Sequence, residues 1–139
     1  LSAYLVYHEI NWVVLCDLFN DGLSTPDLVL KNLKHLNIPV DKVRFITGDS
    51  LVEIPKINGQ YTFDYILVDG GHDKNIARQD LENAVVLIEK DGRILFDDIT
   101  PDGCSLQDVW DEFKQKHLTN FIFSENHDGK GIGIAKRIA

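Results

Sequence analysis

The sequence predicts an α/β fold, a doubly wound and mostly parallel sheet with an antiparallel strand near its C-terminal end. Short apolar runs of strand length alternate along the chain with longer segments whose apolar residues recur at helical spacing. The last two runs, residues 120–124 and 131–136, are joined by a turn-rich segment that contains no helix. Alternating strands and helices predict parallel pairing, and the closing pair predicts an antiparallel hairpin.

Length and composition fit one globular domain that spans residues 1–139. Hydrophobic residues make up 44% of the chain and charged residues 26%, an ordinary mixture. No apolar run approaches the roughly 20 residues that a membrane-spanning helix needs, and no signal peptide is apparent. Cys16 and Cys104 lack the number and spacing of a disulfide framework or a zinc site. We therefore expect a cytoplasmic protein with reduced thiols and no membrane partner.

The formal net charge of -8 disfavours nucleic acid as the main partner. Phosphate binding needs clustered Lys and Arg side chains, and this chain has 14 of them against 22 Asp and Glu. The acidic balance instead favours a cation or a small molecule.

The chain opens directly into the helix-like residues 3–10, without a preceding cap, and it contains no methionine. It is therefore expected to be a fragment of a longer protein. Residues 12–16 form a continuous apolar run, typical of a strand buried on both faces, and this run ends at Asp17.

The next helix is predicted to start at Ser24 or Thr25, with Pro26 in its first turn, and to stop before Pro39. Its apolar face comprises Leu28, Leu30, Leu33 and Leu36. Residues 43–47 and 63–68 predict two strands, and only a short helix fits between them.

Residues 75–89 carry apolar side chains at helical spacing, and Asp91-Gly92 has the character of a C-cap that ends this helix. A strand over residues 93–96 follows at once. One more amphipathic helix is predicted by the spacing of Leu106, Val109, Trp110 and Phe113.

Two of the predicted strands run directly into acids, the first into Asp69 and the second into Asp97 and Asp98. Because the carboxyl ends of parallel strands open into the ligand crevice, these carboxylates are expected within a few ångströms of one another. Such a trio repels itself unless it is neutralised, and hard cations such as Mg²⁺ prefer oxygen ligands. We expect a metal or catalytic site, the alternative being aspartates that only cap turns.

His72 lies three residues beyond Asp69, across Gly70 and Gly71, a spacing that lets its imidazole fold back over the same crevice. Its ordinary pKa of about 6.5 suits it to accept a proton at neutral pH. His72 is therefore a candidate catalytic base, with Asp69 as a second catalytic candidate. The alternative is a partly exposed histidine that leads a helix.

Asp17 and Asp49 end two other predicted strands. An acid at the position of Asp17 suits hydrogen bonds from the two hydroxyls of a ribose, and Asp49 could receive the exocyclic amine of a base. Each has an alternative, since Asp17 could cap the following loop and Asp49 the short helix.

No Gly-x-Gly-x-x-Gly loop, Gly-x-Ser-x-Gly elbow or Walker loop occurs in a suitable context. Covalent acyl or phosphoryl chemistry is therefore disfavoured, although Cys104 stays open as a reactive thiol.

These residues together resemble the class I S-adenosylmethionine (SAM)-dependent methyltransferases. The likeness is to small-molecule O-methyltransferases that carry an Asp-Gly-x-His turn, here residues 68–72, and a Gly-x-hydrophobic-Asp-Asp strand, here residues 92–98. It extends from Asp17 through Gly48-Asp49 to residues 131–134. The resemblance implies a Rossmann-like sheet of seven strands with an antiparallel last strand.

The resemblance also implies roles for single residues. Asp17 would bind the cofactor ribose, Asp49 would lie near the adenine, and Asp69 would also border the cofactor. Three carboxylates would hold Mg²⁺ or another divalent cation, those of Asp69, Asp97 and Asp98. His72 would lie near the acceptor, whose metal-bound oxygen would attack the sulfonium methyl in line.

The family's first strand and glycine-rich turn would precede Leu1, so the resemblance implies an N-terminally truncated domain. Truncation would leave a gap between the strands that end at Asp17 and Asp69, with backbone groups that need partners.

Three functions follow from these observations. The leading hypothesis is a Mg-dependent O-methyltransferase that acts on a small molecule. The second is a non-catalytic module that keeps the fold for assembly or ligand sensing, with the open sheet edge as a homodimer interface. The third is a metal-dependent hydrolase, for which the sequence supplies neither nucleophile nor phosphate-binding element.

Overall fold

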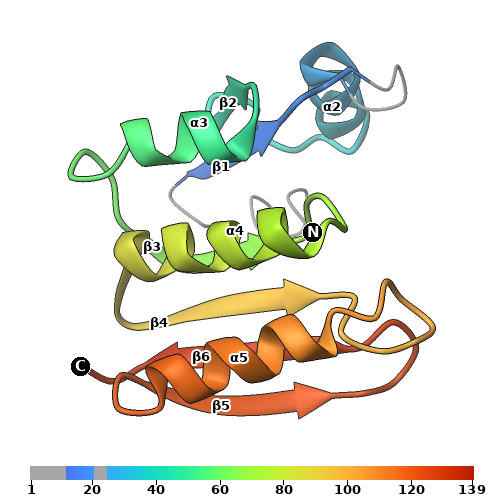
Figure 1. The fold of residues 1–139 in the computed structure, drawn as a ribbon. Helices are drawn as coiled ribbons and strands as arrows, with labels where there is room; N and C mark the ends of the chain where they lie inside the picture. The colour runs from blue at the N-terminus through green and yellow to red at the C-terminus, as the bar shows by residue number, and fades with distance from the viewer. Residues whose placement is uncertain (1–11, 21–24) are drawn as a thin grey trace. The chain divides into compact units, whose positions relative to one another are not determined.

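The computed structural model describes residues 12–20 and 25–139, and the chain divides into two compact units between Ile54 and Pro55 (Figure 1). Within the described residues, the first unit holds a two-stranded sheet and the second a four-stranded sheet. The helix expected over residues 3–10 and the candidate cap Ser24 lie outside this description.

The first unit is built on two parallel strands, β1 (Val13–Asp17) and β2 (Val43–Thr47), as the sequence predicts. Their register places Asp17 opposite Thr47, so both strands end at the same edge. The short helix α3 (Ser50–Lys56) follows β2. A small core is formed by Val13, Leu33, Ile38 and Val43.

Helix α2 (Pro26–His35) begins where the sequence indicates. Thr25 is its N-cap, because the Thr25 hydroxyl accepts a hydrogen bond of 3.2 Å from the amide of Leu28. The proline that opens the helix occupies a first-turn position, where a missing N–H costs nothing. The predicted apolar face is only partly covered, since Leu33 is buried while Leu28 and Leu36 are exposed.

The second unit contains the strands β3 (Phe63–Val68), β4 (Ile88–Asp97), β5 (Phe121–Asn126) and β6 (Ile132–Arg137), in the order β3-β4-β6-β5. Strands β3 and β4 are parallel, and β6 is antiparallel to both of its neighbours. The structure therefore confirms a mixed sheet with an antiparallel closing strand, which lies one strand inside the edge. Six strands are present among the described residues, compared with the seven that the resemblance implies.

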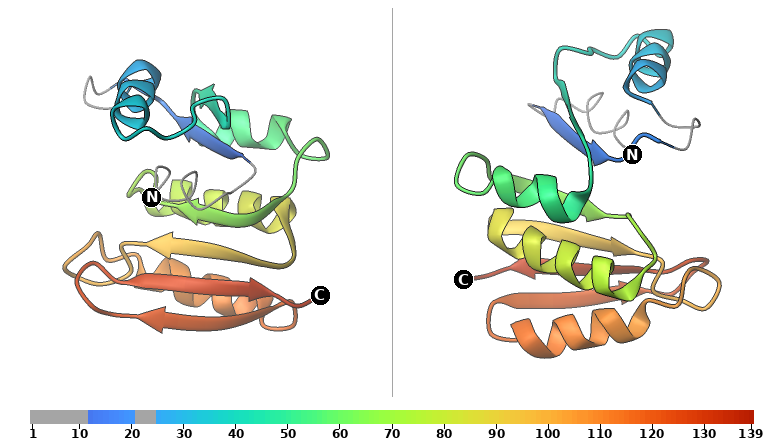
Figure 2. Two further views of the ribbon diagram at one scale, coloured as in Figure 1. Left: turned by 180° about the vertical axis from the view of Figure 1, so that it is seen from behind. Right: turned by 45° about the horizontal axis from the view of Figure 1, so that its top comes forward.

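Helices α4 (Lys74–Leu87) and α5 (Gln107–His117) cover one face of this sheet (Figures 1 and 2). The four residues that predicted α5 are all buried: Leu106, Val109, Trp110 and Phe113. They pack with Leu81 of α4 and Phe96 of β4 in the main core. None of the helices among the described residues combines the length and hydrophobicity needed to cross a membrane.

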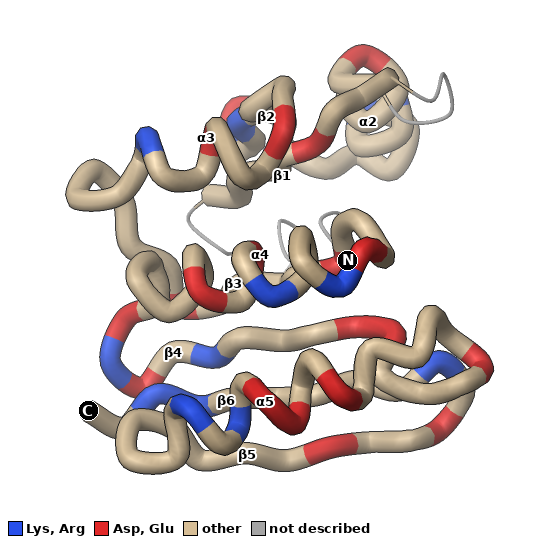
Figure 3. Tube along the Cα trace, in the orientation of Figure 1, with Lys and Arg blue, Asp and Glu red and all other residues tan. Residues whose placement is uncertain are grey.

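Charge pairs join the exposed sides of the two helices. Lys74 lies 2.7 Å from Asp108, and Arg78 lies 2.6 Å from Glu112. Figure 3 shows the basic segments of α4 opposite acidic segments of α5. Asp108 and Glu112 of α5 are thus paired with cations of the neighbouring helix, whereas Asp111 pairs with Lys114 of α5 itself.

The boundary between α4 and β4 differs from the prediction. The helix expected over residues 75–89 ends earlier, because Ile88 already pairs with Phe63 in the sheet and is 2% exposed. A single apolar residue satisfies a helical and a strand pattern equally well. After Ile88, the regular pairing with β3 resumes only at Arg93, so the residues between Ile88 and Arg93 bulge from the ladder. Asp91 (φ 66°) belongs to this bulge and does not cap a helix.

Candidate functional site

Three carboxylates converge at the carboxyl ends of β3 and β4. Asp69 directly follows β3, Asp97 is the last residue of β4, and Asp98 follows it. The parallel register places Val68 opposite Phe96, so the two strands deliver their acids to the same edge. One oxygen from each carboxylate lies within 4.8 Å of the other two, an arrangement that could hold a cation. The structure thus brings together the trio that the sequence singled out.

Asp98 is the buried member of the trio, with 2% of its surface exposed. Its backbone has φ 62°, a left-handed conformation that aspartate tolerates better than most residues. The Asp98 carbonyl accepts a hydrogen bond of 3.1 Å from the amide of Leu106, which fixes the loop after β4. The turn therefore directs the Asp98 carboxylate inward, while Asp97 stays half-buried and Asp69 exposed.

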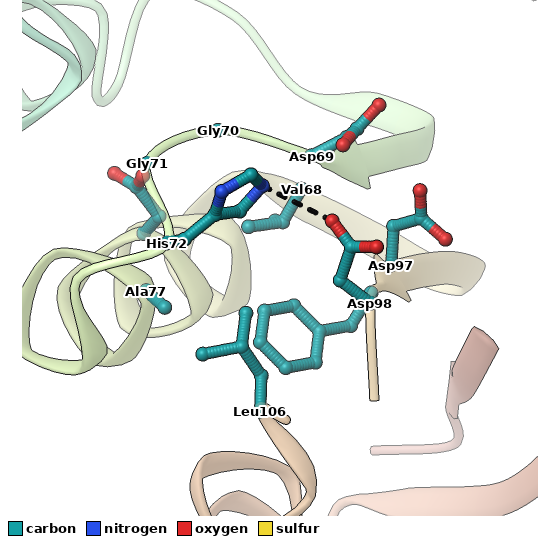
Figure 4. Close-up of a pocket in the computed structure, with 11 residues that line it drawn as sticks. Val68, Asp69, Gly70, Gly71, His72, Ala77, Asp97, Asp98 and Leu106 are labelled. Atoms are coloured by element: carbon teal, nitrogen blue, oxygen red, sulfur yellow. Dashed lines mark ion pairs between the residues drawn. The ribbon is translucent and has the colours of Figure 1, made fainter. Parts of the chain in front are cut away.

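His72 contacts Asp98 across the site. Its Nε2 lies 3.1 Å from Asp98 Oδ2, and Figure 4 shows the imidazole reaching from the loop after β3 toward that carboxylate. The next residue, Asp73, is the N-cap of α4 and accepts hydrogen bonds from the amides of Asn75 and Ile76. His72 thus leads a helix, with its side chain 56% exposed, and it also faces the acids, while its role as a base stays a prediction.

Lys130 places a positive charge beside the buried carboxylate of Asp98. Its Nζ lies 3.3 Å from Asp98 Oδ1, an ion-pair distance, although that oxygen accepts no hydrogen bond in the described structure. The turn that carries Lys130 is held in place because the Thr100 amide donates to the Lys130 carbonyl and the Thr100 hydroxyl to the Gly129 carbonyl. Lys130 was not predicted, because it lies about thirty residues along the chain from Asp98 and no local pattern links the two.

The electrostatics of the site reflect crowding of like charge. Partial desolvation of the Asp69 carboxyl by its surroundings, together with the charges of Asp97 and Asp98, raises the pKa of this solvent-exposed residue. The Lys130 ammonium and His72 act in the opposite direction and only partly offset this effect. Interaction with the Asp98 carboxylate in turn raises the pKa of Lys130.

A small pocket lies beside these groups (Figure 4). It is lined by Val68, Asp69, Gly70, Gly71, His72, Ala77, Asp80, Phe96, Asp97, Asp98 and Leu106. Apolar side chains, carboxylates and the imidazole thus line the same pocket.

The two acids of the first unit lie together at the edge where β1 and β2 end. The Asp17 carboxylate accepts a hydrogen bond of 3.0 Å from the amide of Phe19, and the Asp49 carboxylate one of 2.9 Å from the amide of Leu51. These are the capping roles that the sequence left open as alternatives. Each bond uses one oxygen and orients the carboxylate, so ligand binding by Asp17 and Asp49 stays a prediction.

A protein-family profile described as "Methyltransferase domain" matches residues 3–99. Among curated proteins no match was found. A solved structure described as an rRNA-methylase, from Clostridium thermocellum, superimposes with a TM-score of 0.77 at 17% identity, over 99% of this chain and 80% of that one.

Two solved O-methyltransferases are also similar. TomG from Streptomyces achromogenes, in complex with SAM, has a TM-score of 0.77 at 16% identity, over 99% of this chain and 68% of that one. The O-methyltransferase from Bacillus cereus, in complex with SAH, has a TM-score of 0.68 at 16% identity, over 98% of this chain and 78% of that one. At such identities the likeness shows the fold that these proteins share.

Proposed function

Because this chain belongs to the methyltransferase-domain family, we propose that it transfers a methyl group from SAM to an oxygen of a small molecule with the help of a divalent cation. The fold that it shares with solved O-methyltransferases supports this reaction class. The finer assignment depends on one observation, the convergence of Asp69, Asp97 and Asp98 at the ends of β3 and β4.

The donor chemistry of the trio fits Mg²⁺. All three side chains offer carboxylate oxygens, and the buried Asp98 Oδ1 accepts no hydrogen bond from the described residues, although Lys130 lies at ion-pair distance. A divalent cation would also relieve the mutual repulsion of the carboxylates. Bound there, Mg²⁺ would lower the pKa of an acceptor hydroxyl and fix the position of its oxygen.

His72 is proposed as the group that takes the acceptor's proton. Asp98 Oδ2, 3.1 Å from Nε2, orients the ring. In the neutral tautomer that donates Nε2–H to Asp98, the Nδ1 atom carries the free lone pair and can accept a proton. The His72 side chain is 56% exposed and lines the pocket, so an acceptor could approach it there.

Asp17 and Asp49 are proposed to bind the cofactor, Asp17 at the ribose hydroxyls and Asp49 near the adenine. Capping bonds from Phe19 and Leu51 hold the two carboxylates in fixed orientations, which lowers the entropic cost of binding a ligand. We propose that both units act as one methyltransferase domain. The family match supports this, because residues 3–99 cross the boundary between the units.

A small acceptor is favoured over nucleic acid. The net charge of -8 would repel a phosphate backbone, although one similar structure is described as an rRNA-methylase. O-methyltransferases such as TomG are the more suitable comparison, since the acids of this site suit a hydroxyl that binds beside a cation.

Isothermal titration of SAM and MgCl₂ into the chain tests the proposal. We expect the parent chain to bind both ligands. The Asp97→Asn variant should lose Mg²⁺ affinity, whereas Asp91→Asn should keep it. Asp91 is an exposed acid in the same strand, at the opposite end from the site. Absence of heat with either ligand would overturn the proposal. If the chain binds both ligands but forms no SAH, the demethylated product of SAM, with any of a panel of phenols and sugars as acceptors, a non-catalytic module would be favoured instead.

A further inference from the structure

His72, Asp98 and Cys104 form a second cluster, which shares only Asp98 with the acidic trio. One nitrogen, one oxygen and one sulfur from these residues lie within 4.8 Å of one another. Cys104 is half-buried in the loop between β4 and α5. That loop folds closely over Asp98, since a Cβ on Gly103 would lie 2.7 Å from Asp98 Oδ1. Only glycine permits this approach, which brings the thiol to the site.

The donors of this cluster differ in kind from those of the trio. Imidazole, thiolate and carboxylate are together a ligand set typical of Zn²⁺, whereas Mg²⁺ takes oxygen ligands. His72 Nε2 and Asp98 Oδ2 are 3.1 Å apart. Two ligands about 2.0 Å from a tetrahedral zinc ion would be separated by roughly 3.3 Å, so these atoms need to move little. Three protein ligands would leave the fourth position for water or another ligand.

The buried Asp98 carboxylate favours a positive charge beside it. Its Oδ1 accepts no hydrogen bond from the described residues, an arrangement that costs free energy unless a cation compensates it. Lys130 supplies a charge at 3.3 Å, but its side chain is 64% exposed and can withdraw into solvent when another cation enters.

We propose that His72, Asp98 and Cys104 bind a divalent cation of the zinc class, with the Cys104 thiol losing its proton to solvent on binding. The separate positions of the three ligands along the chain explain why no zinc spacing is visible in the sequence. A zinc ion on His72 Nε2 leaves the proton of the neutral ring on Nδ1, so His72 can no longer take the acceptor's proton. Inhibition of Mg-supported methyl transfer by zinc is the consequence, and this consequence alone rests on the proposed function.

Titration with Co²⁺, followed by absorption, tests the binding site directly. A thiolate ligand produces a sulfur-to-cobalt charge-transfer band in the near ultraviolet, so the intact chain should develop this band with one equivalent of metal. The Cys16→Ser variant is the matched control, because it removes the other thiol and should keep the band. The Asp97→Asn variant should also keep it, because Asp97 belongs only to the oxygen set.

The Cys104→Ser variant should lose the band and bind Zn²⁺ about 100-fold more weakly in competition with a chromophoric chelator. Loss of the band in Cys16→Ser, or its retention in Cys104→Ser, would overturn the proposal. Thermal unfolding of Cys104→Ser checks its fold, and His72→Gln supplies a second variant that should weaken zinc to a similar extent. Failure of zinc binding with intact Mg²⁺ and SAM binding would reject this site while leaving the proposed function in place.

Discussion

Gly133 of β6 lies directly against the indole ring of Trp110, so that a Cβ at this position would come within 2.7 Å of Cδ2. Trp110 is fully buried and stacks with Phe96 and Phe113 at the centre of the core. It cannot move away without disturbing these rings. We therefore expect Gly133→Ala to lower the free energy of unfolding by about 1–3 kcal/mol, the usual cost of overpacking a core.

Urea unfolding followed by tryptophan fluorescence measures this effect. Ser124→Ala on the exposed side of β5 is the control and should change stability by less than about 0.5 kcal/mol. Equal stability of Gly133→Ala and the parent would show that the core is looser than the packing of Trp110 indicates.

We expect the charge of Asp97 to lower the free energy of unfolding when no metal is bound. Its carboxylate lies beside those of Asp69 and Asp98, and it contributes to the raised pKa of Asp69. We expect Asp97→Asn to raise the free energy of unfolding by up to about 1 kcal/mol in EDTA, because one of three repelling charges is removed. The same variant should lose the stabilisation that Mg²⁺ gives the parent. A clear loss of stability in EDTA would show that Asp97 has a structural role instead.

Glu82 makes stability depend on pH at a distance from the site. Burial alone would raise its pKa, but hydrogen bonds and charges from Lys116 and His117 outweigh burial and lower the pKa below the ordinary 4.5. A lowered folded-state pKa contributes stability above the unfolded-state pKa, and this contribution is lost as the pH falls through the folded-state value.

The Glu82→Gln variant isolates this charge while keeping an oxygen acceptor. Parent and variant should differ by up to about 1 kcal/mol near pH 7, and the difference should shrink below the ordinary glutamate pKa and vanish once the pH has fallen through the lowered folded-state pKa. Denaturant unfolding at a series of pH values measures it. A difference that grows as the pH falls would contradict the assigned direction.

The sequence predicted the elements wherever local pattern and burial agree. Strand β3 was located from its short apolar run, and the apolar face of α5 from a helical spacing that also describes what is buried. The boundary at Ile88 was missed, because an apolar residue suits either element and only its pairing with Phe63 decides the matter. The strand-end acids were identified because parallel strands end at a common edge.

The remaining parts of the site depend on contacts between distant segments. Lys130 approaches Asp98 only because the β5–β6 turn is bonded to Thr100, and Cys104 approaches only because Gly103 lets the loop close. Neither contact leaves a periodic pattern in the sequence. The positive charge beside Asp98 and the presence of a sulfur donor near the acids could therefore be identified only from the tertiary structure.

Lys130 should limit cation binding at the acidic trio. Its ammonium lies 3.3 Å from Asp98 Oδ1 and so competes with a divalent ion for the same carboxylate. Lys130→Gln removes that competing charge and should tighten Mg²⁺ binding several-fold, with a larger gain at low ionic strength, where charge repulsion is less screened. Lys136→Gln is the control, because Lys136 pairs with Asp91 in the bulge at the other end of β4. Calorimetric titration at two salt concentrations should show tighter binding only for Lys130→Gln, whereas weaker binding would mean that Lys130 mainly holds Asp98 in its ligand position.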